Sequence, residues 1–125
     1  MALAKGPGLE QFARQVNTSF TVRTELKPVK LILVEASAFS SATPYSEDAH
    51  NEKFSLLFRG STQEPLEQDS YLFEHPRLRR HVIFIVPIGS QDTTYCHYEA
   101  IFNRPVNPAE LARQLSRAPR RIQMG

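Results

Sequence analysis

The sequence contains only one cysteine, Cys96, so an intrachain disulfide is excluded. No apolar run approaches the roughly 18 residues that a membrane-spanning helix needs. The first dozen residues hold one lysine and no apolar stretch long enough for a signal peptide. Reduced thiols are typical of the cytosol. We therefore expect a cytoplasmic protein that makes no membrane contact, with later incorporation into an appendage or particle left open.

Signatures of catalysis and of metal binding are also missing. The sequence has no GxSxG nucleophile elbow and no phosphate-binding glycine loop. Its four histidines show neither HExxH nor HxH spacing, and no second cysteine accompanies them. His97 and Glu99 share a strand face, but residues two apart do so on any strand. We expect no catalytic residue, no cofactor and no metal site, and an enzyme ranks third among the functions considered.

The strongest pattern that is present covers residues 81–103, which predict two β-strands around a polar turn. In the first strand Val82, Phe84 and Val86 fall on one face, and Ile83 and Ile85 fall on the other. Such a near-continuous apolar run is typical of a strand buried on both faces. The second strand has an apolar face made by the following residues: Cys96, Tyr98, Ala100 and Phe102. We expect Phe84 and Phe102 to be buried on the same side of the sheet.

Four further segments alternate as strands do, over residues 19–26, 29–36, 53–60 and 70–75. The expected inward residues are Phe20, Val22, Thr24, Leu26, Phe54, Leu56 and Phe58. Leu31 and Leu33 share one face of their strand, with Ile32 and Val34 on the other, and Tyr71 and Phe73 share one face of theirs. Leu66, in the loop before the last of these strands, is expected to tuck onto the core. The short connections favour antiparallel neighbours. We predict an all-β fold, a mainly antiparallel six-stranded barrel or closed sandwich with a short helix at each end.

The chain has the length of one domain, which we place at residues 1–125, with a core over about residues 9–103. Helical spacing predicts a first helix over residues 8–15. A second helix is predicted to open at Asn107, which can cap it, and to end by Pro119. Residues 38–52 form a long polar loop, either a mobile hairpin tip or a functional segment.

Residues 104–125 form a C-terminal capping helix and basic tail with five arginines and one acidic residue. Such a tail can bind an acidic partner surface, or it can be a solvated helix end whose cations complement the helix dipole. Nucleic acid is a disfavoured partner, because tyrosines at period two are typical of a core. The candidate partner-binding residues are Leu111, Leu115, Arg113, Arg117, Arg120 and Arg121.

Several blocks occur together in one order. They are residues 54–60 (FSLLFRG), 65–68 (PLEQ), 71–76, 84–87 (FIVP) and 98–103 (YEAIFN). Together they resemble a small bacterial domain family of unknown function, whose members are often encoded beside phage-tail-collar or tail-fibre-like proteins. The resemblance covers about residues 9–103. The family usually has glycine where this chain has Asp69, and it tends to carry glycine near Arg79. Aspartate tolerates the left-handed conformation, so we expect the turn at Asp69 to be kept.

The resemblance implies a context and no catalytic residue. Our leading hypothesis is a non-enzymatic interaction or assembly protein, an accessory or structural component of a bacterial tail-fibre-like or surface appendage system. Its partner would be another protein, a tail-fibre-like one among the candidates, or a second copy of the chain through an open sheet edge. The alternative is a small-molecule-binding β-barrel with its pocket under residues 38–52.

Overall fold

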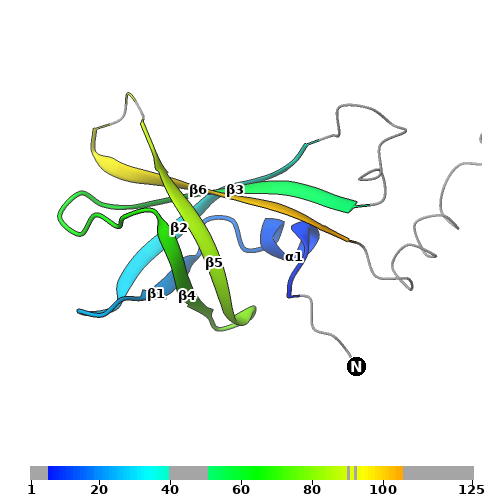
Figure 1. Cartoon of the computed structure of the whole chain (residues 1–125), viewed down its shortest axis with the longest axis horizontal. Coiled ribbons are helices and arrows are strands. Elements are labelled where there is room, and N and C mark those ends of the chain that lie inside the picture. The colour runs from blue at the N-terminus through cyan, green and yellow to red at the C-terminus, as the bar shows by residue number, and fades with distance from the viewer. Residues whose placement is uncertain (1–5, 40–50, 90, 92, 106–125) are drawn as a thin grey trace, which may run out of the picture.

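The computed structural model describes residues 6–39, 51–89, 91 and 93–105. Six antiparallel strands close into a barrel in the order β1-β2-β3-β6-β5-β4 (Figure 1). The predicted six-stranded antiparallel barrel is thus confirmed over the sandwich. The predicted C-terminal helix lies outside the described residues. The elements are α1 (Leu9–Ala13), β1 (Ser19–Arg23), β2 (Val29–Ala38), β3 (Asn51–Ser61), β4 (Asp69–His75), β5 (Arg79–Ile88) and β6 (Tyr95–Pro105).

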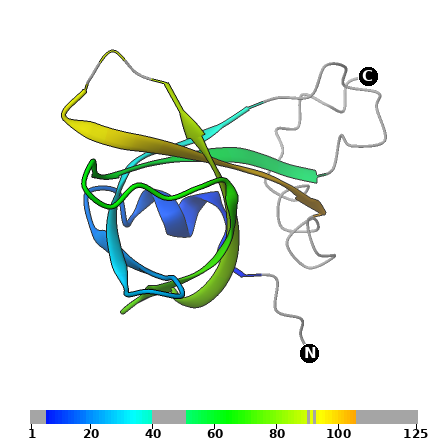
Figure 2. The same ribbon diagram turned by 60° about the vertical axis from the view of Figure 1, so that its left-hand side comes forward.

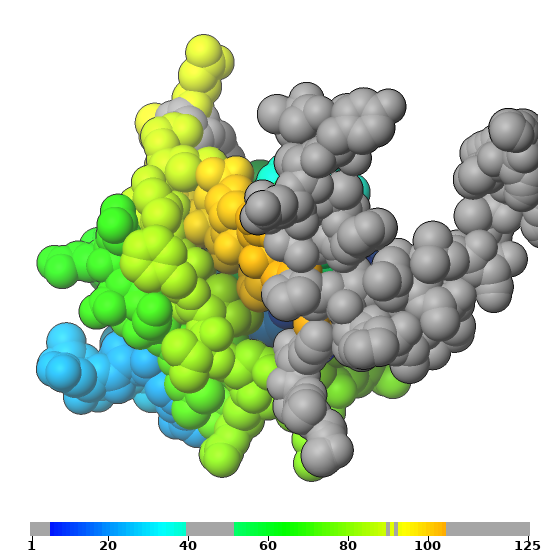
Figure 3. Space-filling model, turned by 45° about the vertical axis from the view of Figure 1, so that its right-hand side comes forward, coloured from blue at the N-terminus to red at the C-terminus, as the bar shows by residue number. Residues whose placement is uncertain are grey.

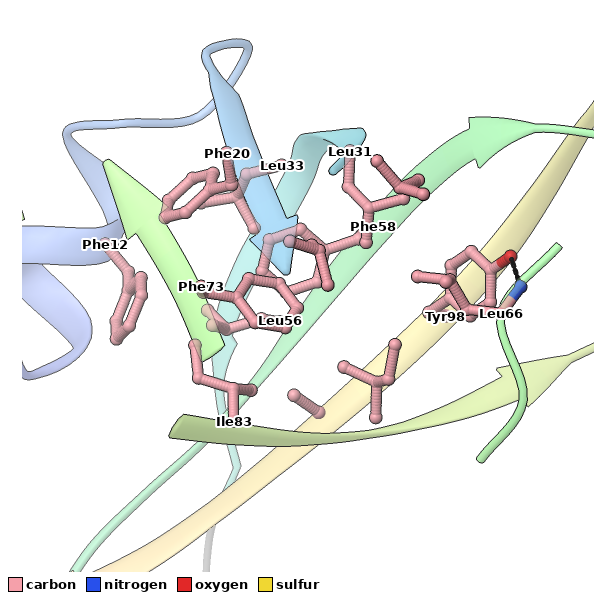
Figure 4. Close-up of a cluster of buried hydrophobic side chains, with 14 of the residues drawn as sticks. Phe12, Phe20, Leu31, Leu33, Leu56, Phe58, Leu66, Phe73, Ile83 and Tyr98 are labelled. Atoms are coloured by element: carbon pink, nitrogen blue, oxygen red, sulfur yellow. Dashed lines mark hydrogen bonds between the residues drawn. The ribbon is translucent and has the colours of Figure 1, made fainter. Parts of the chain in front are cut away.

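Alternating apolar residues from the strands fill the inside of the barrel (Figure 4). Phenylalanine rings dominate the middle, where the ring centroids of Phe58 and Phe73 lie 5.1 Å apart. Phe20 meets Phe58 edge-on at 5.4 Å. Burial of this apolar surface is the main force that holds the strands together. Most of the predicted inward residues are confirmed as buried: Phe20, Val22, Phe54, Leu56, Phe58 and Leu66. The structure also buries Leu31, Leu33, Phe73, Tyr98 and Ala100.

The short helix α1 closes one end of the barrel, as Figure 2 shows in blue inside the ring of strands. A helix of five residues is not stable alone in water, so tertiary contacts must hold it. Phe12 supplies them, with its ring centroid 6.0 Å from that of Phe54 and 5.7 Å from that of Phe102. The backbone N–H of Leu9 also donates to Glu52 Oε2 at 3.1 Å. The predicted first helix is confirmed, although it is shorter than predicted.

The strand predicted over residues 19–26 ends at Arg23, so the inward placement of Thr24 and Leu26 was wrong. The Thr24 hydroxyl donates to Lys27 O at 2.6 Å and accepts from the N–H groups of Leu26 and Lys27. A hydroxyl that bonds its own turn competes with the sheet ladder and bends the chain. Leu26 therefore lies at the tip of the turn, 93% exposed.

A bulge interrupts the pairing of β2 with β3 between Leu33 and Glu35. One extra residue on β2 reverses which side chains face inward. Leu31 and Leu33 point into the core before the bulge, and Ala36 packs against it afterwards. The bulge lets one strand of ten residues follow the curve of the barrel.

Candidate interaction surface

The outer face of β5 carries large apolar side chains. Ile83 and Ile85 point into the barrel and are buried, whereas Val82 is 69% exposed and Phe84 is 50% exposed. The predicted burial of Phe84, and of both faces of this strand, was therefore wrong. The exposed face of β5 is called the β5 stripe below and consists of Val82, Phe84, Val86 and Ile88.

The β5 stripe continues onto β4, because Leu72 lies directly opposite Val82 in the register. Isolated exposed apolar residues are common on soluble proteins, whereas a group of them on one face is typical of an interaction surface. Ile101, 58% exposed, lies on the outer face of the next strand, β6. Figure 3 shows this side of the molecule, with β5 in yellow-green beside β6 in orange.

Beside the stripe, the barrel wall is only partly closed. β5 pairs with β6 at three positions, from Val86 to Ile88. From Arg79 to Ile85, β5 pairs with β4 alone, and the second half of β6 pairs with β3 alone. Figure 1 shows β5 and β6 diverging toward the α1 end. Among the described residues, β5 therefore has a free edge over 79–85, where backbone groups lack a partner strand.

A hollow of about 190 Å³ lies where the two strands separate. Its lining includes Phe12 of α1, Gly6 and Pro7 of the N-terminal segment, and His81 and Phe102 of the two strands. The described part of this N-terminal segment makes no backbone hydrogen bond to β5. The segment thus fills part of the opening without taking the place of a strand.

Cations gather at the end of β5 nearest α1. Arg77, Arg79 and Arg80 are exposed there, and within the described part of the chain none of them has an ion pair. In contrast, Arg104 of β6 donates to Glu52 Oε1 at 2.9 Å, with both side chains largely shielded from solvent. The free edge of β5 therefore begins at a basic turn and continues into the apolar stripe.

A second hollow, a groove of about 650 Å³, lies at the opposite end between the β1–β2 turn and the β3–β4 loop. Lys27 Nζ bridges the two loops by an ion pair with Glu64 at 2.7 Å. Burial and the nearby charge of Asp69 raise the pKa of Tyr71, whose hydroxyl donates to Glu67 O at 2.8 Å. The pocket predicted under residues 38–52 falls largely outside the described residues, and this groove is formed by other loops.

Tyr98 fixes the β3–β4 loop against the barrel. Its hydroxyl accepts the N–H of Leu66 at 2.8 Å (Figure 4), and burial raises the pKa of the phenol. Tyr95 instead lies under the guanidinium of Arg59, 4.6 Å from the ring centroid. Cys96 is half-buried against the core. The three described tyrosines, Tyr71, Tyr95 and Tyr98, therefore do not form a common outer platform.

The sequence-predicted site and the observed surface differ. Leu111, Leu115, Arg113, Arg117, Arg120 and Arg121 lie outside the described residues. In the described ranges, no three side chains of His, Cys, Asp or Glu gather as metal ligands. Nor is any described helix long and apolar enough to cross a membrane. Sequence reasoning missed the β5 stripe, although one signal was present: Arg80 shares its strand face with Val82 and Phe84.

The fold and surface define a small closed β-barrel domain with a packed interior and an apolar outer stripe beside a free strand edge. The chain belongs to the family described as domain of unknown function DUF6916, whose family model matches residues 7–102. No curated protein and no solved structure matches the chain.

Proposed function

We propose that this protein is a non-enzymatic interaction domain that works by assembly with another protein chain. The β5 stripe carries the proposal. Val82 and Phe84 remain 69% and 50% exposed, although the inner face of the same strand is fully used by the core. Exposed apolar surface contributes nothing to folding and favours association, by roughly 25 cal/mol for each Å² buried against a partner.

The biological setting we propose is an accessory or structural role in a bacterial tail-fibre-like or surface appendage system. This part rests on the sequence resemblance to a family often encoded beside tail-fibre-like proteins. The partner would be a fibre or collar protein that covers the stripe.

A binding site for a small molecule is the second candidate, favoured by the groove of about 650 Å³. The barrel interior offers no comparable space in the described chain, because side chains such as Phe20, Phe58 and Phe73 fill it. A ligand would therefore bind at the loop end of the barrel, in a groove lined by the β1–β2 turn and the β3–β4 loop.

The test uses the tagged full chain to capture partners from its native host. Any protein recovered is then purified and its binding measured directly with three forms of the chain. We expect Phe84→Ser to weaken binding at least tenfold, because it removes an apolar anchor from the stripe. Leu26→Ser is the matched control, since Leu26 is equally apolar and 93% exposed but lies on the β1–β2 turn. Equal binding by all three forms would contradict the proposal.

A further inference from the structure

We infer that the outer face of β5 binds an acidic segment of the partner protein. The inference rests on the proposed assembly function and names the chemistry of the partner. Carboxylates of the segment would pair with the basic turn, which consists of Arg77, Arg79 and Arg80. An apolar side chain beside them would cover Val82 and Phe84 of the β5 stripe, which are exposed on the same strand.

The charges of the basic turn have no counter-charge within the described chain. Each of the other described arginines has a partner, either a carboxylate or an aromatic ring: Arg14 with Glu10, Arg23 with Glu74, Arg104 with Glu52, and Arg59 over Tyr95. One carboxylate is placed beside the turn, because Glu74 of β4 lies opposite Arg80. It is already paired with Arg23 at 3.0 Å. The guanidinium groups of the basic turn are therefore left for an anion from outside the described chain.

The spacing of the surface suits a short protein segment. Arg80 shares its strand face with Val82 and Phe84, and residues two apart on a strand are about 7 Å apart. An extended segment along β5 has the same spacing between its own side chains. It can place a carboxylate on Arg80 and a large apolar side chain on the stripe at once. A carboxylate also matches the planar guanidinium, to which it can accept two parallel hydrogen bonds.

The hollow beside Val82 gives the apolar half of this surface its depth. It has a volume of about 190 Å³, and the rings of Phe12 and Phe102 belong to its lining. Binding energy at protein interfaces is concentrated where a large side chain fills a well-packed pocket. We expect the apolar side chain of the segment to enter this hollow.

Two other kinds of anionic partner fit this surface less well. A nucleic acid is held mainly by contacts to its phosphates, and its polar backbone would leave Val82 and Phe84 in water. An anionic membrane would bring its negative headgroups against Glu74 and Glu99, on the strands at either side of β5. An acidic protein segment satisfies both the charges of the turn and the apolar side chains of the stripe.

The experiment selects binders of the full chain from a library of random-sequence peptides. The library is first depleted with the Phe84→Ser chain, so that the peptides recovered with the parent chain depend on the stripe. We expect these peptides to be enriched in aspartate and glutamate within four positions of a large apolar residue. One of them is then synthesised, and its affinity is measured by calorimetry for the parent chain and its variants.

Arg80→Gln should weaken the peptide at least fivefold, because it removes a guanidinium from the face of the stripe. Arg77→Gln, in the turn itself, gives a second and independent measurement of the same effect. Lys30→Gln is the matched control and should change the affinity less than twofold. Lys30 is an exposed cation without an ion pair in the described chain, and it lies on β2, across the barrel from β5.

Peptides without acidic enrichment would overturn the inference, and so would equal affinity for the parent, Arg77→Gln and Arg80→Gln chains. Tighter binding of a DNA duplex or of phosphatidylserine vesicles, lost in Arg80→Gln, would also overturn it, since the turn would then serve phosphate. The two proposals fail separately. If no peptide remains after depletion with Phe84→Ser, the assembly function through the stripe fails. If stripe-dependent peptides are recovered that carry no acidic residues, that function stands and only the chemistry of its partner changes.

Discussion

His75 joins three parts of the fold through one buried imidazole. Its Nδ1 accepts the backbone N–H groups of Arg77 and Leu78 at 3.0 and 3.3 Å, which shapes the β4–β5 turn. Its Nε2 lies 2.9 Å from the hydroxyl of Thr18, which itself donates to Gln15 O. Because Nδ1 accepts both N–H groups through its one lone pair, it carries no proton, so the neutral ring is protonated at Nε2, which donates to the Thr18 hydroxyl. Burial, and then the charge of Arg77, lower the pKa of His75.

This geometry predicts a pH-dependent stability. Unfolded His75 takes up a proton near pH 6.5, whereas the folded form resists protonation because its pKa is lowered. The unfolded state then binds more protons, so stability is complete above about pH 6.5, falls as the pH drops below that value, and levels off below the folded pKa. His75→Gln should reduce the free energy of unfolding at pH 8 by about 1–3 kcal/mol. It should also make the fall between pH 7 and 5 shallower, as measured by urea unfolding. An unchanged pH profile in the variant would contradict this role.

Arg79 adopts a left-handed backbone conformation with φ of 73°. For a residue with a Cβ this conformation is less favourable by roughly 1–2 kcal/mol, whereas glycine adopts it without this cost. Arg79→Gly should therefore raise the free energy of unfolding by about 0.5–1 kcal/mol after the greater chain entropy of glycine is subtracted. Arg80→Gly, in an extended position, should lower it. A loss of stability in both variants, measured by denaturant midpoints, would show that Arg79 is not strained.

The sequence resemblance pointed to a glycine near Arg79 in the family, but no backbone conformation was predicted for this position. The structure gives the reason, a turn that needs a positive φ. At Asp69, where a turn was expected, the prediction was wrong. Asp69 begins β4 and does not adopt a left-handed conformation, and its Oδ1 accepts the N–H of Ser70 at 2.7 Å.

At the scale of elements, strand positions were predictable from alternation, because one residue in two faces the core. β3 shows this, with Phe54, Leu56 and Phe58 inward as expected. The inward residues of β5 could not be predicted in this way. Both of its faces are apolar, so the alternation does not show which face points into the core. Which face turns inward is decided by pairing with β4 and β6, far along the chain. The free edge could not be predicted at all, because it depends on where β6 leaves β5.

The orientation of β5 predicts a contrast between two phenylalanines. Phe73→Ala should cost about 3–5 kcal/mol, since the ring is 1% exposed and packs against Phe20 and Phe58. Phe84→Ala should cost less than about 1 kcal/mol, because half of its surface is already in water. Chemical unfolding of both variants measures the difference. Equal losses would mean that Phe84 belongs to the core and that the outward stripe does not exist.

At the scale of the whole molecule, the barrel has a tightly packed core, but its strands are not paired with both neighbours along their whole length. The core is packed from α1 to the β3–β4 loop, and Tyr98 holds that loop in place. The wall between β5 and β6 remains open at the α1 end, beside the apolar stripe. This distribution leaves one strand edge and one apolar face of the described chain available for association.

The most direct test of this account is backbone hydrogen exchange of the full chain, alone and with an excess of the captured partner protein. Association through the β5 stripe predicts that exchange over β5 slows when the partner is present, because the partner covers this strand. Exchange in β1, which is paired on both sides within the barrel, should not change. Exchange over β5 that is the same with and without the partner, or protection that appears on another strand, would contradict association through this face.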